Sequence, residues 1–339
     1  MQGSSPFQEM RRLVAGHSIS IAISVVAELG VPDLLADGPK TASELARRVG
    51  AHEDFLRRVL RFLASEGVFA EQPGDRFALA PMSEWLRSDV ANSQRPRAVF
   101  SGSAASWTAW GKLLSAVKSG RSGVYEAFGE NLFEYAARDP AAAAAFNRFM
   151  ADQTASSVAA LLAAYDFSGI RQLVDVGGGR GALVTGVLAA HPAMQGILFD
   201  VPAVVATAPA TLANLGVADR CRIVGGSFFD GVPGGGDAYA LKFILHDWTD
   251  ADCIRILRNC RSAMAPGGRV LVIEHVVPTD SSPNFAHFMD LTMLAMTPGG
   301  RERTESEFAR LFEAAGLRLQ RRVVTPIDLC VLECVEAAT

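Results

Sequence analysis

A cluster of glycines directly after an apolar run is the feature that most limits how this chain can fold. The run Leu173–Val176 leads straight into three consecutive glycines that begin at Gly177, and a second apolar run ends at Asp200, 23 residues after Gly177. We expect a strand, a glycine turn, a helix and a second strand that ends in an acid. This arrangement suits a nucleoside, because the turn lets a ligand approach the backbone and the acid accepts hydrogen bonds from ribose hydroxyls. The segment predicts a nucleoside cofactor. The spacing of Gly177, Gly179 and Ala182 also fits a dinucleotide.

From Gly169 onward, short apolar runs alternate with stretches of helical pattern. The predicted strands are Gln172–Val176, Gly196–Asp200, Arg222–Val224, Ala238–Phe243, Arg269–Glu274, Arg318–Val324 and Leu329–Glu333. This alternation predicts a Rossmann-like α/β fold with a doubly wound, mostly parallel sheet. The last two runs are close enough for a hairpin, so we expect an antiparallel edge strand.

The first part of the chain has a helical pattern. Ser18–Glu28 has a helical apolar period, Thr41 and Glu44 form a capping box, and the predicted helix Asp54–Glu66 is followed by a short hairpin. Helix, turn, helix and hairpin together predict a mainly helical winged-helix domain ahead of the sheet. The alanine run Ala141–Ala145 favours a further helix by propensity.

We therefore expect three parts. Residues 1–100 would form a winged-helix-like dimerisation domain, residues 101–165 a helical linker that roofs the substrate pocket, and residues 166–339 the cofactor-binding catalytic domain. Phe146, Phe149 and Met150 stand just before the last part and are candidates for the roof.

Charge and composition narrow the classes of partner. A net charge of −4 supplies no basic field for a polyanion, so we expect no nucleic-acid partner. The apolar helix Ser18–Leu29 suits a dimer interface, so we expect a homodimer. Arg57, Arg58 and Arg61 on the second helix of the winged-helix motif keep a DNA-binding regulator as an alternative. The apolar-leaning run Ile19–Leu35 is too interrupted to span a bilayer, so no membrane partner is expected.

The five cysteines include no C-x-x-C pair, and the chain has no export pattern at its start. Both observations favour reduced, buried thiols and a cytoplasmic protein rather than a disulfide or zinc framework.

Two further segments follow predicted strands. Ser227–Phe229 places a turn and aromatic rings after the third strand, which suits a purine, and the fourth strand passes through Lys242 into His246-Asp247-Trp248. Ligands of such sheets bind outside the carboxyl ends of the strands, so these residues should converge with Gly177 and Asp200 on one rim.

Residues 171–305 resemble the class I S-adenosylmethionine-dependent O-methyltransferases of small molecules. The whole chain resembles the plant caffeate-type and bacterial antibiotic-tailoring members. The motifs that carry the resemblance, in the family's order, are Val174–Gly181, Phe199–Pro202, His246–Trp248, Pro266–Glu274 and Gly299–Thr304. The resemblance implies methyl transfer from S-adenosylmethionine to a hydroxyl of an aromatic or polyketide-like small molecule in secondary metabolism. S-adenosylhomocysteine would be the product, without a metal.

The resemblance also implies roles for individual residues. The implied cofactor-binding residues are Gly177, Gly179, Asp200, Ser227, Phe228 and Lys242, and the implied acceptor-binding residues are Met150, Met289, Met293 and Thr297. His246 would be the general base, flanked by Glu274 and Glu302. A phenol of pKa about 10 is a poor nucleophile at neutral pH, whereas a histidine near 6.5 accepts its proton as the oxygen attacks.

Several alternatives stay open at this stage. Ser227 stands where many relatives carry Asp, and Thr297 where some carry Asn, so neither adenine contact nor substrate identity transfers directly. Nearby arginines offer Glu274 and Glu302 a salt-bridge role, helical methionines also serve as plain core, and His17 is a candidate to reach a partner's active site. Rival functions are a same-fold hydroxylase or decarboxylase, a carboxylate methyltransferase and an NAD-dependent oxidoreductase. The acceptor and its regiochemistry are not determined by the sequence.

Overall fold

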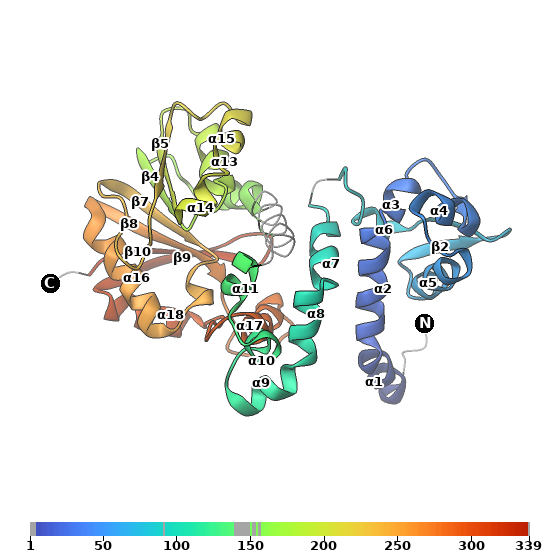
Figure 1. Ribbon diagram of the computed structural model, residues 1–339. Helices are drawn as coiled ribbons and strands as arrows, with labels where there is room; N and C mark the ends of the chain where they lie inside the picture. The colour runs from blue at the N-terminus through green and yellow to red at the C-terminus, as the bar shows by residue number, and fades with distance from the viewer. Residues whose placement is uncertain (1–4, 91, 139–149, 151–153, 155–156, 338–339) are drawn as a thin grey trace. The chain divides into compact units, whose positions relative to one another are not determined.

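The structure is a computed structural model that describes residues 5–90, 92–138, 150, 154 and 157–337 (Figure 1). These residues divide into two compact units, one drawn from 1–107 and 140–152, the other from 108–139 and 153–339. The predicted helix at Ala141–Ala145 and the candidate roof residues Phe146 and Phe149 lie outside the described residues.

The first unit is mainly helical, as predicted. Its elements are α1 (Pro6–Val14), α2 (Gly16–Glu28), α3 (Val31–Leu34), β1 (Lys40–Thr41), α4 (Ala42–Val49), α5 (Glu53–Ser65), β2 (Phe69–Gln72), β3 (Arg76–Leu79), α6 (Pro81–Glu84) and α7 (Arg95–Ser101), while α8 (Ala104–Gly111) crosses the boundary between the units. Thr41 and Glu44 form the predicted capping box of α4, and β1, β3 and β2 form a small antiparallel sheet after α5. The winged-helix prediction is confirmed.

No single helix among the described residues is both long enough and apolar enough to cross a bilayer. Taken together, α1 and α2 have the length and composition of a crossing, as a pair bent by 47°.

The second unit contains a seven-stranded sheet and its helices. The elements before the sheet are α9 (Leu113–Ser119), α10 (Gly123–Phe128) and α11 (Leu132–Arg138). The strands are β4 (Gln172–Val176), β5 (Gln195–Asp200), β6 (Cys221–Gly225), β7 (Gly236–Lys242), β8 (Met264–His275), β9 (Leu317–Val324) and β10 (Leu329–Glu336). The helices between strands are α13 (Ala182–Ala190), α14 (Pro202–Val205), α15 (Pro209–Asn214), the 3₁₀ turn η1 (Leu245–Asp247), α16 (Asp250–Ala263), α17 (Phe285–Met296) and α18 (Glu305–Ala314). All seven predicted strands are present.

The strand order is β6-β5-β4-β7-β8-β10-β9. Pairings from β6 to β8 are parallel, whereas β10 runs antiparallel to both β8 and β9. The predicted hairpin and the antiparallel pairing at the edge are therefore confirmed. The strand that runs against the others is β10, one place in from the edge, because β10 inserts between β8 and β9.

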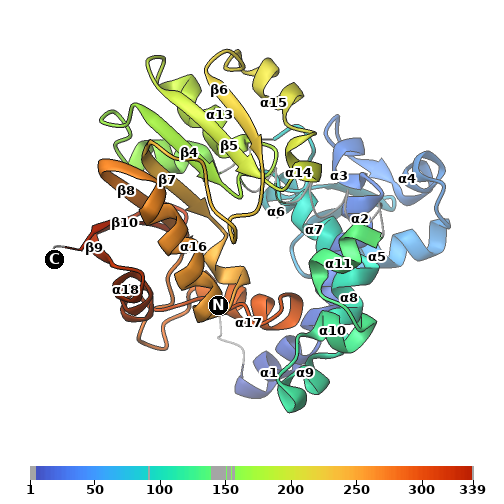
Figure 2. The same ribbon diagram turned by 60° about the vertical axis from the view of Figure 1, so that its left-hand side comes forward.

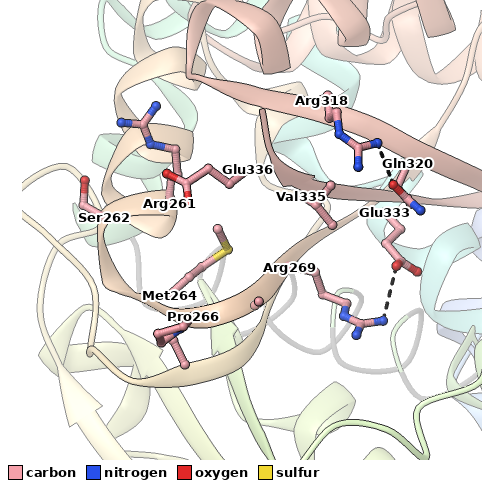
Figure 3. A pocket seen from close by; sticks show the side chains of 13 residues that line it. Arg261, Ser262, Met264, Pro266, Arg269, Arg318, Gln320, Glu333, Val335 and Glu336 are labelled. Carbon is pink, nitrogen blue, oxygen red and sulfur yellow. Dashed lines mark hydrogen bonds and ion pairs between the residues drawn. The ribbon is translucent and has the colours of Figure 1, made fainter. Parts of the chain in front are cut away.

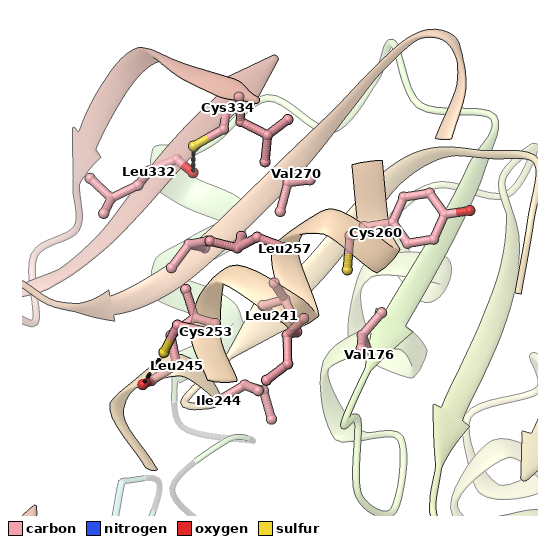
Figure 4. Packing of buried hydrophobic residues seen from close by; sticks show 14 of the residues in the cluster. Val176, Leu241, Ile244, Leu245, Cys253, Leu257, Cys260, Val270, Leu332 and Cys334 are labelled. Carbon is pink, nitrogen blue, oxygen red and sulfur yellow. Dashed lines mark hydrogen bonds between the residues drawn. The ribbon is translucent and has the colours of Figure 1, made fainter. Parts of the chain in front are cut away.

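Helices cover both faces of this sheet, with α16 and α18 packed side by side on one face and α13 on the other (Figures 1 and 2). Figure 4 shows Val176, Leu241 and Val270 of the sheet meeting Leu257 and Cys260 of α16, all five fully buried. Full burial of such an aliphatic side chain stabilises the fold by about 1.5–3 kcal/mol. All five cysteines are buried and free, as expected of small hydrophobic residues in a core.

The strand order places the glycine turn at the point where the winding of the sheet reverses. After β4 the chain crosses to β5 on one side and later returns to β7 on the other side. Such a reversal leaves a crevice at the carboxyl ends of the central strands, which is where doubly wound folds bind ligands. The turn that begins at Gly177 follows β4 directly.

A hollow of about 940 Å³ lies at the other end of the sheet (Figure 3). Residues at the start of β8, including Pro266 and Gly268, line it together with the Arg269–Glu333 ion pair of 3.2 Å. The first half of the Pro266–Glu274 motif therefore lies away from the rim that its last residue, Glu274, helps to form.

Candidate active site

The glycine turn exposes backbone at the end of β4. Gly177 adopts a φ of 68°, and its N–H donates to the carbonyl of Phe199 on β5 at 2.8 Å. A Cβ at Gly177 would lie 2.4 Å from Ile244 Cδ1. Gly179 also has a positive φ, of 60°, but no atom would lie within 4 Å of its Cβ. Gly177 is thus required by packing within the protein, whereas Gly179 faces open space that a ligand can fill.

Asp200 ends β5 beside this turn. Its carboxylate accepts the N–H of Gly179 at 2.8 Å and the N–H of Val201 at 2.6 Å. Burial raises the pKa of Asp200, and these two backbone hydrogen bonds oppose the rise by favouring the carboxylate. The interaction joins two residues that the sequence separates by a whole helix.

Ser227 and Phe228 follow β6 on the same rim. The Phe228 ring lies 3.6 Å from the position that a Cβ on Gly177 would take, and it packs edge-on against Trp248 at 6.0 Å between centroids. Asn259 of α16 donates to the Phe228 carbonyl at 2.8 Å and so fixes the loop from below. Ser227 is half-buried, and its hydroxyl accepts the N–H of Phe229 at 3.3 Å.

Lys242 is the last residue of β7 and is buried. Its Nζ donates to Thr154 Oγ1 at 3.1 Å and lies 3.8 Å from the centroid of the Phe243 ring. Burial lowers the pKa of Lys242 to about 7, although the carboxylates of Glu274 and Asp175 favour the charged form. Thr154 was not identified from the sequence, because nothing local marks a threonine 88 residues away as a partner.

His246 lies in η1 with its imidazole between two buried carboxylates. Its Nδ1 is 2.8 Å from Glu302 Oε1 and 3.4 Å from Glu274 Oε2, and both glutamate side chains are fully buried. Its Nε2 lies 3.7 Å from Asp247 Oδ1. Because Glu302 can only accept in its ionised form, Nδ1 carries a proton in this arrangement, and Nε2 is an acceptor when the ring is neutral.

Glu274 has a second task. Its Oε1 accepts the backbone N–H groups of Ile244 and Leu245 at 2.9 and 3.0 Å, and that of His246 at 3.4 Å. These donors open η1, where backbone N–H groups have no partner within the helix. Glu274 therefore holds the turn that carries the imidazole, while Glu302 orients the imidazole itself.

Phe243 connects β7 to this turn in a conformation unusual for a residue with a side chain. Its φ is 55°, in the left-handed region, and its ring stacks on His246 at 5.4 Å with an interplanar angle of 8°. Backbone strain of this kind costs about 1–3 kcal/mol and is retained where surrounding contacts enforce it. Sequence reasoning missed Phe243, because strain is visible only in the folded backbone.

The carboxylates change the basicity of the imidazole. Burial alone would disfavour the charged ring, but Glu274, Glu302 and Asp247 outweigh it and raise the pKa of His246 to about 10. Burial also raises the pKa of Glu274 to about 7 and that of Asp247 to about 6. His246 is therefore a stronger base than the value near 6.5 expected for a free histidine.

The arginines near these glutamates in the sequence have other partners. Arg269 pairs with Glu333, Arg301 with Glu307, and Arg303 with Asp250. The alternative in which these arginines neutralise Glu274 and Glu302 is therefore wrong, because each guanidinium pairs with a different carboxylate.

The three side chains also meet the spacing of a metal site. Ligand atoms of His246, Glu274 and Glu302 lie within 4.8 Å of one another, and one oxygen of each glutamate is buried without a hydrogen-bond partner in the described part of the chain. However, Nδ1 is at hydrogen-bond distance from Glu302, and Glu274 already binds the η1 backbone. The hydrogen-bonded imidazole accounts for the cluster without an ion.

The predicted acceptor-binding residues belong to both units. Met289 and Met293 lie on the buried face of α17, and Thr297 follows this helix with its hydroxyl donating to the Met293 carbonyl at 2.9 Å. Met150 belongs to the first unit and is half-buried. The acceptor roles of these residues stay a prediction.

Two family models match this chain. The O-methyltransferase domain model covers residues 110–318, more than half of the chain, and the O-methyltransferase dimerisation domain model covers residues 11–89. The chain belongs to the O-methyltransferase family. This confirms the resemblance noted in the sequence and the enzyme class that it implied.

Individual relatives agree with this assignment. The methyltransferase is 41% identical over 322 residues to a phenazine O-methyltransferase from Lysobacter antibioticus, covering 95% of this chain and 94% of the relative. It is 43% identical over 302 residues to the mitomycin biosynthesis 6-O-methyltransferase of Streptomyces lavendulae, covering 88% and 86%. A solved O-methyltransferase from neocarzinostatin biosynthesis, in complex with S-adenosylmethionine and 2-hydroxy-5-methyl naphthoic acid, matches with a TM-score of 0.80 at 32% identity over 94% of this chain and 95% of that one.

Proposed function

We propose that this methyltransferase transfers the methyl group of S-adenosylmethionine to a hydroxyl of an aromatic or polyketide-like small molecule in secondary metabolism. The observation that carries the proposal is the imidazole of His246. It is held through Nδ1 by Glu302, and in the neutral ring Nε2 is the hydrogen-bond acceptor at the rim of the sheet. This class of acceptor is supported by the relatives named above: a phenazine O-methyltransferase, an O-methyltransferase of mitomycin biosynthesis, and one solved with 2-hydroxy-5-methyl naphthoic acid.

The residues at the rim fit an adenosyl cofactor. The open space at Gly179 is one that a ligand can fill, Asp200 suits ribose hydroxyls, and Ser227 with Phe228 offers a hydroxyl and a ring to the adenine. Lys242 is assigned to close the site. When bound, S-adenosylmethionine supplies an electrophilic methyl group and leaves as S-adenosylhomocysteine.

In the proposed mechanism, His246 removes the proton of the acceptor hydroxyl through Nε2. Glu302 fixes the tautomer through Nδ1, and Glu274 stabilises the imidazolium that forms. A base with a pKa of about 10 is matched to a phenol, whose pKa is also about 10, so the proton moves with little free-energy cost. General-base help of this kind is worth about 10² to 10⁴ in rate, and orientation of the reactants supplies much of the remainder.

A hydroxyl acceptor suits this site better than a carboxylate. A carboxylic acid with a pKa near 4 is already ionised at neutral pH and needs no base, whereas a phenol does. A base held between two buried glutamates would serve no purpose in carboxylate methylation. The histidine base and its two buried glutamates serve to remove a proton from an acceptor hydroxyl. This arrangement favours methyl transfer over the hydroxylase and decarboxylase alternatives.

The helix that carries the proposed acceptor residues packs against part of the preceding segment. Within the second unit, α9 and α10 pack against α17, and the ring of Trp110 stacks on that of Phe288 at 6.4 Å. This packing supports the proposal that the segment 101–165 roofs the acceptor, with Met289, Met293 and Thr297 below it.

We also propose that the enzyme is a homodimer that works in the cytoplasm. Helix α1 has no buried residue, and its apolar side chains are largely exposed: Phe7 75%, Met10 60%, Leu13 59% and Val14 71%. A stripe of this kind at helical spacing suits a partner helix. The matched dimerisation model supports a second copy as that partner, and the five free thiols support a reducing compartment.

A methylation assay with two histidine variants tests the proposed function. Candidate phenols are incubated with the enzyme and methyl-labelled S-adenosylmethionine, and the product is followed by the mass of one added methyl group. We expect His246→Ala to lower kcat by about 10² to 10⁴, while calorimetric affinity for S-adenosylhomocysteine stays near that of the parent. His287→Ala, which alters an exposed histidine of α17, is the matched control and should keep full activity.

Chelation is a second arm of the same assay. EDTA should leave turnover unchanged, since the proposed mechanism uses no metal. Unchanged turnover in His246→Ala would reject the base, and tight binding of NAD in place of S-adenosylhomocysteine would reject the enzyme class.

A further inference from the structure

Arg303 is the largest fully buried side chain of the described residues, with 1% of its surface exposed. Its guanidinium donates through Nη1 to the carbonyl of Leu245 at 2.9 Å and through Nη2 to the carbonyl of Trp248 at 2.9 Å. Nε and Nη2 both bind Asp250 Oδ1, at 3.0 and 2.7 Å. One cation therefore holds both ends of the segment 245–250 that contains His246.

The neighbours of Arg303 along the chain hold the same segment. Glu302 accepts from His246 Nδ1, and the N–H of Arg301 donates to the His246 carbonyl at 2.8 Å. Gly300 approaches so closely that a Cβ there would lie 2.3 Å from that carbonyl oxygen. Arg303 is in turn tied to the end of the sheet by a bridge to Val276, directly after β8.

We infer that Arg303 is a positioning residue. It holds the turn that contains His246 against the segment 300–303, so that Glu302 and the imidazole keep their hydrogen bond. The inference rests on the proposed function, because it explains how the base is held rather than what reaction is catalysed. It also explains why a charge is buried at this place. An arginine offers five donors in a planar fork, and this fork reaches one carboxylate and the carbonyls of Leu245, Trp248 and Arg301 at once.

The cost of burying this cation is offset by Asp250, whose own side chain is 61% exposed. An isolated buried guanidinium would be strongly destabilising, whereas one with a carboxylate and three carbonyl partners is not. Because Asp250 lies at the surface, it can be altered without opening the core. This gives the inference a test that does not depend on a buried substitution.

The experiment compares Arg303→Lys and Asp250→Asn with Asp252→Asn as the matched control. Asp252 lies in the same first turn of α16, but among the described residues its carboxylate binds only Thr249. Lysine keeps the charge of Arg303 and loses the fork, so we expect kcat for a phenol that the wild type methylates to fall about 10- to 100-fold. Asp250→Asn should lower it severalfold, Asp252→Asn should not, and affinity for S-adenosylhomocysteine should stay within about twofold in all three.

Histidine-labelled protein, titrated by NMR without any acceptor, supplies the decisive readout. The groups facing His246 are Glu274 and His275 of β8, Asp247 beside it and Glu302, and none of them is altered. Carboxylates favour the imidazolium, so a loosened Glu302 must move the His246 titration to lower pH in Arg303→Lys and Asp250→Asn. Asp252→Asn should titrate like the parent.

An unmoved His246 titration in folded Asp250→Asn and Arg303→Lys would overturn the inference, whatever happened to activity. A loss of activity in both variants with an unmoved titration would show that Arg303 is only structural. If instead the wild type methylates no phenol while the titrations move as expected, the proposed function fails and the positioning of His246 stands.

Discussion

At the scale of single residues, two glutamates with the same apparent role divide the work at His246. Among the described residues, the carboxylate of Glu302 binds only the imidazole, at 2.8 Å, whereas that of Glu274 also binds the backbone N–H groups that open η1. Removing the charge of Glu302 therefore changes the basicity of the ring. Removing that of Glu274 also releases the turn, so its loss should be the more damaging to folding.

The pH dependence of catalysis follows from the raised pKa of His246. The base must be unprotonated to accept a proton, and its pKa is about 10, so turnover should rise with pH through neutrality into the alkaline range. Glu302→Gln removes a carboxylate that favours the imidazolium. The substitution should therefore lower the His246 pKa and move the rise of kcat with pH to lower pH. It should also reduce the maximal kcat, because the tautomer with the proton on Nδ1 is held less firmly.

The measurement is kcat against pH at saturating acceptor for the parent and Glu302→Gln. Ionisation of the phenol itself also raises the rate with pH, but that limb does not depend on the enzyme variant. A profile that is identical in both proteins would contradict the assignment of Glu302 to His246.

At the scale of elements, the turn after β4 contains two glycines with different reasons for having no side chain. Gly177 packs against Ile244, which follows β7, so its requirement is internal to the protein. Gly179 has open space in front of it, so its requirement lies with the ligand. Both adopt positive φ, in which a side chain costs roughly 1–2 kcal/mol.

Gly179→Ala should therefore lower the free energy of unfolding by roughly 1–2 kcal/mol, and it should reduce affinity for S-adenosylhomocysteine by about tenfold or more, equivalent to about 1.4 kcal/mol. Gly216→Ala is a matched control, because Gly216 has a φ of 65°, open space around its Cβ, and a position in the loop after α15. Denaturant unfolding and calorimetry check the two effects. Equal loss of affinity in both variants would show that the effect comes from backbone strain alone.

At the scale of the whole molecule, the first unit exposes an apolar helix face that has no partner within its own core. Its core contains Leu45, Leu60 and Phe77, yet α1 contributes nothing to that core and presents an apolar stripe instead. A dimer would bury this stripe. The net charge of −4 over the whole chain also supplies no basic field of the kind that DNA binding requires.

Met10→Glu should convert the proposed homodimer into a monomer, because it places a charge in the middle of the α1 stripe. Sedimentation velocity at several protein concentrations measures the change. Arg12→Gln, on the charged side of the same helix beside Glu9, is the control and should leave the assembly intact. A monomeric parent, or a dimer that survives Met10→Glu, would place the interface elsewhere or remove it.

Local sequence alone determined the elements of this protein and the residues at the rim. The seven strands, the capping box at Thr41, and the positions of Gly177 and Asp200 follow from apolar periodicity and turn chemistry, which act over a few residues. The motif containing His246 predicted that this histidine lies at the rim, because it follows a strand whose carboxyl end must face the ligand. Its role as the base is what the family resemblance implies.

Only the tertiary structure decided which groups contact the imidazole of His246 and how they change its basicity. Glu302 lies 56 residues from His246 in the chain, Arg303 binds carbonyls 55 and 58 residues away, and β10 inserts between β8 and β9. Such pairings depend on the summed packing of several elements and on loop closure, and no local pattern encodes that sum. The same packing buries the imidazole between carboxylates, so its basicity belongs to the fold rather than to the residue.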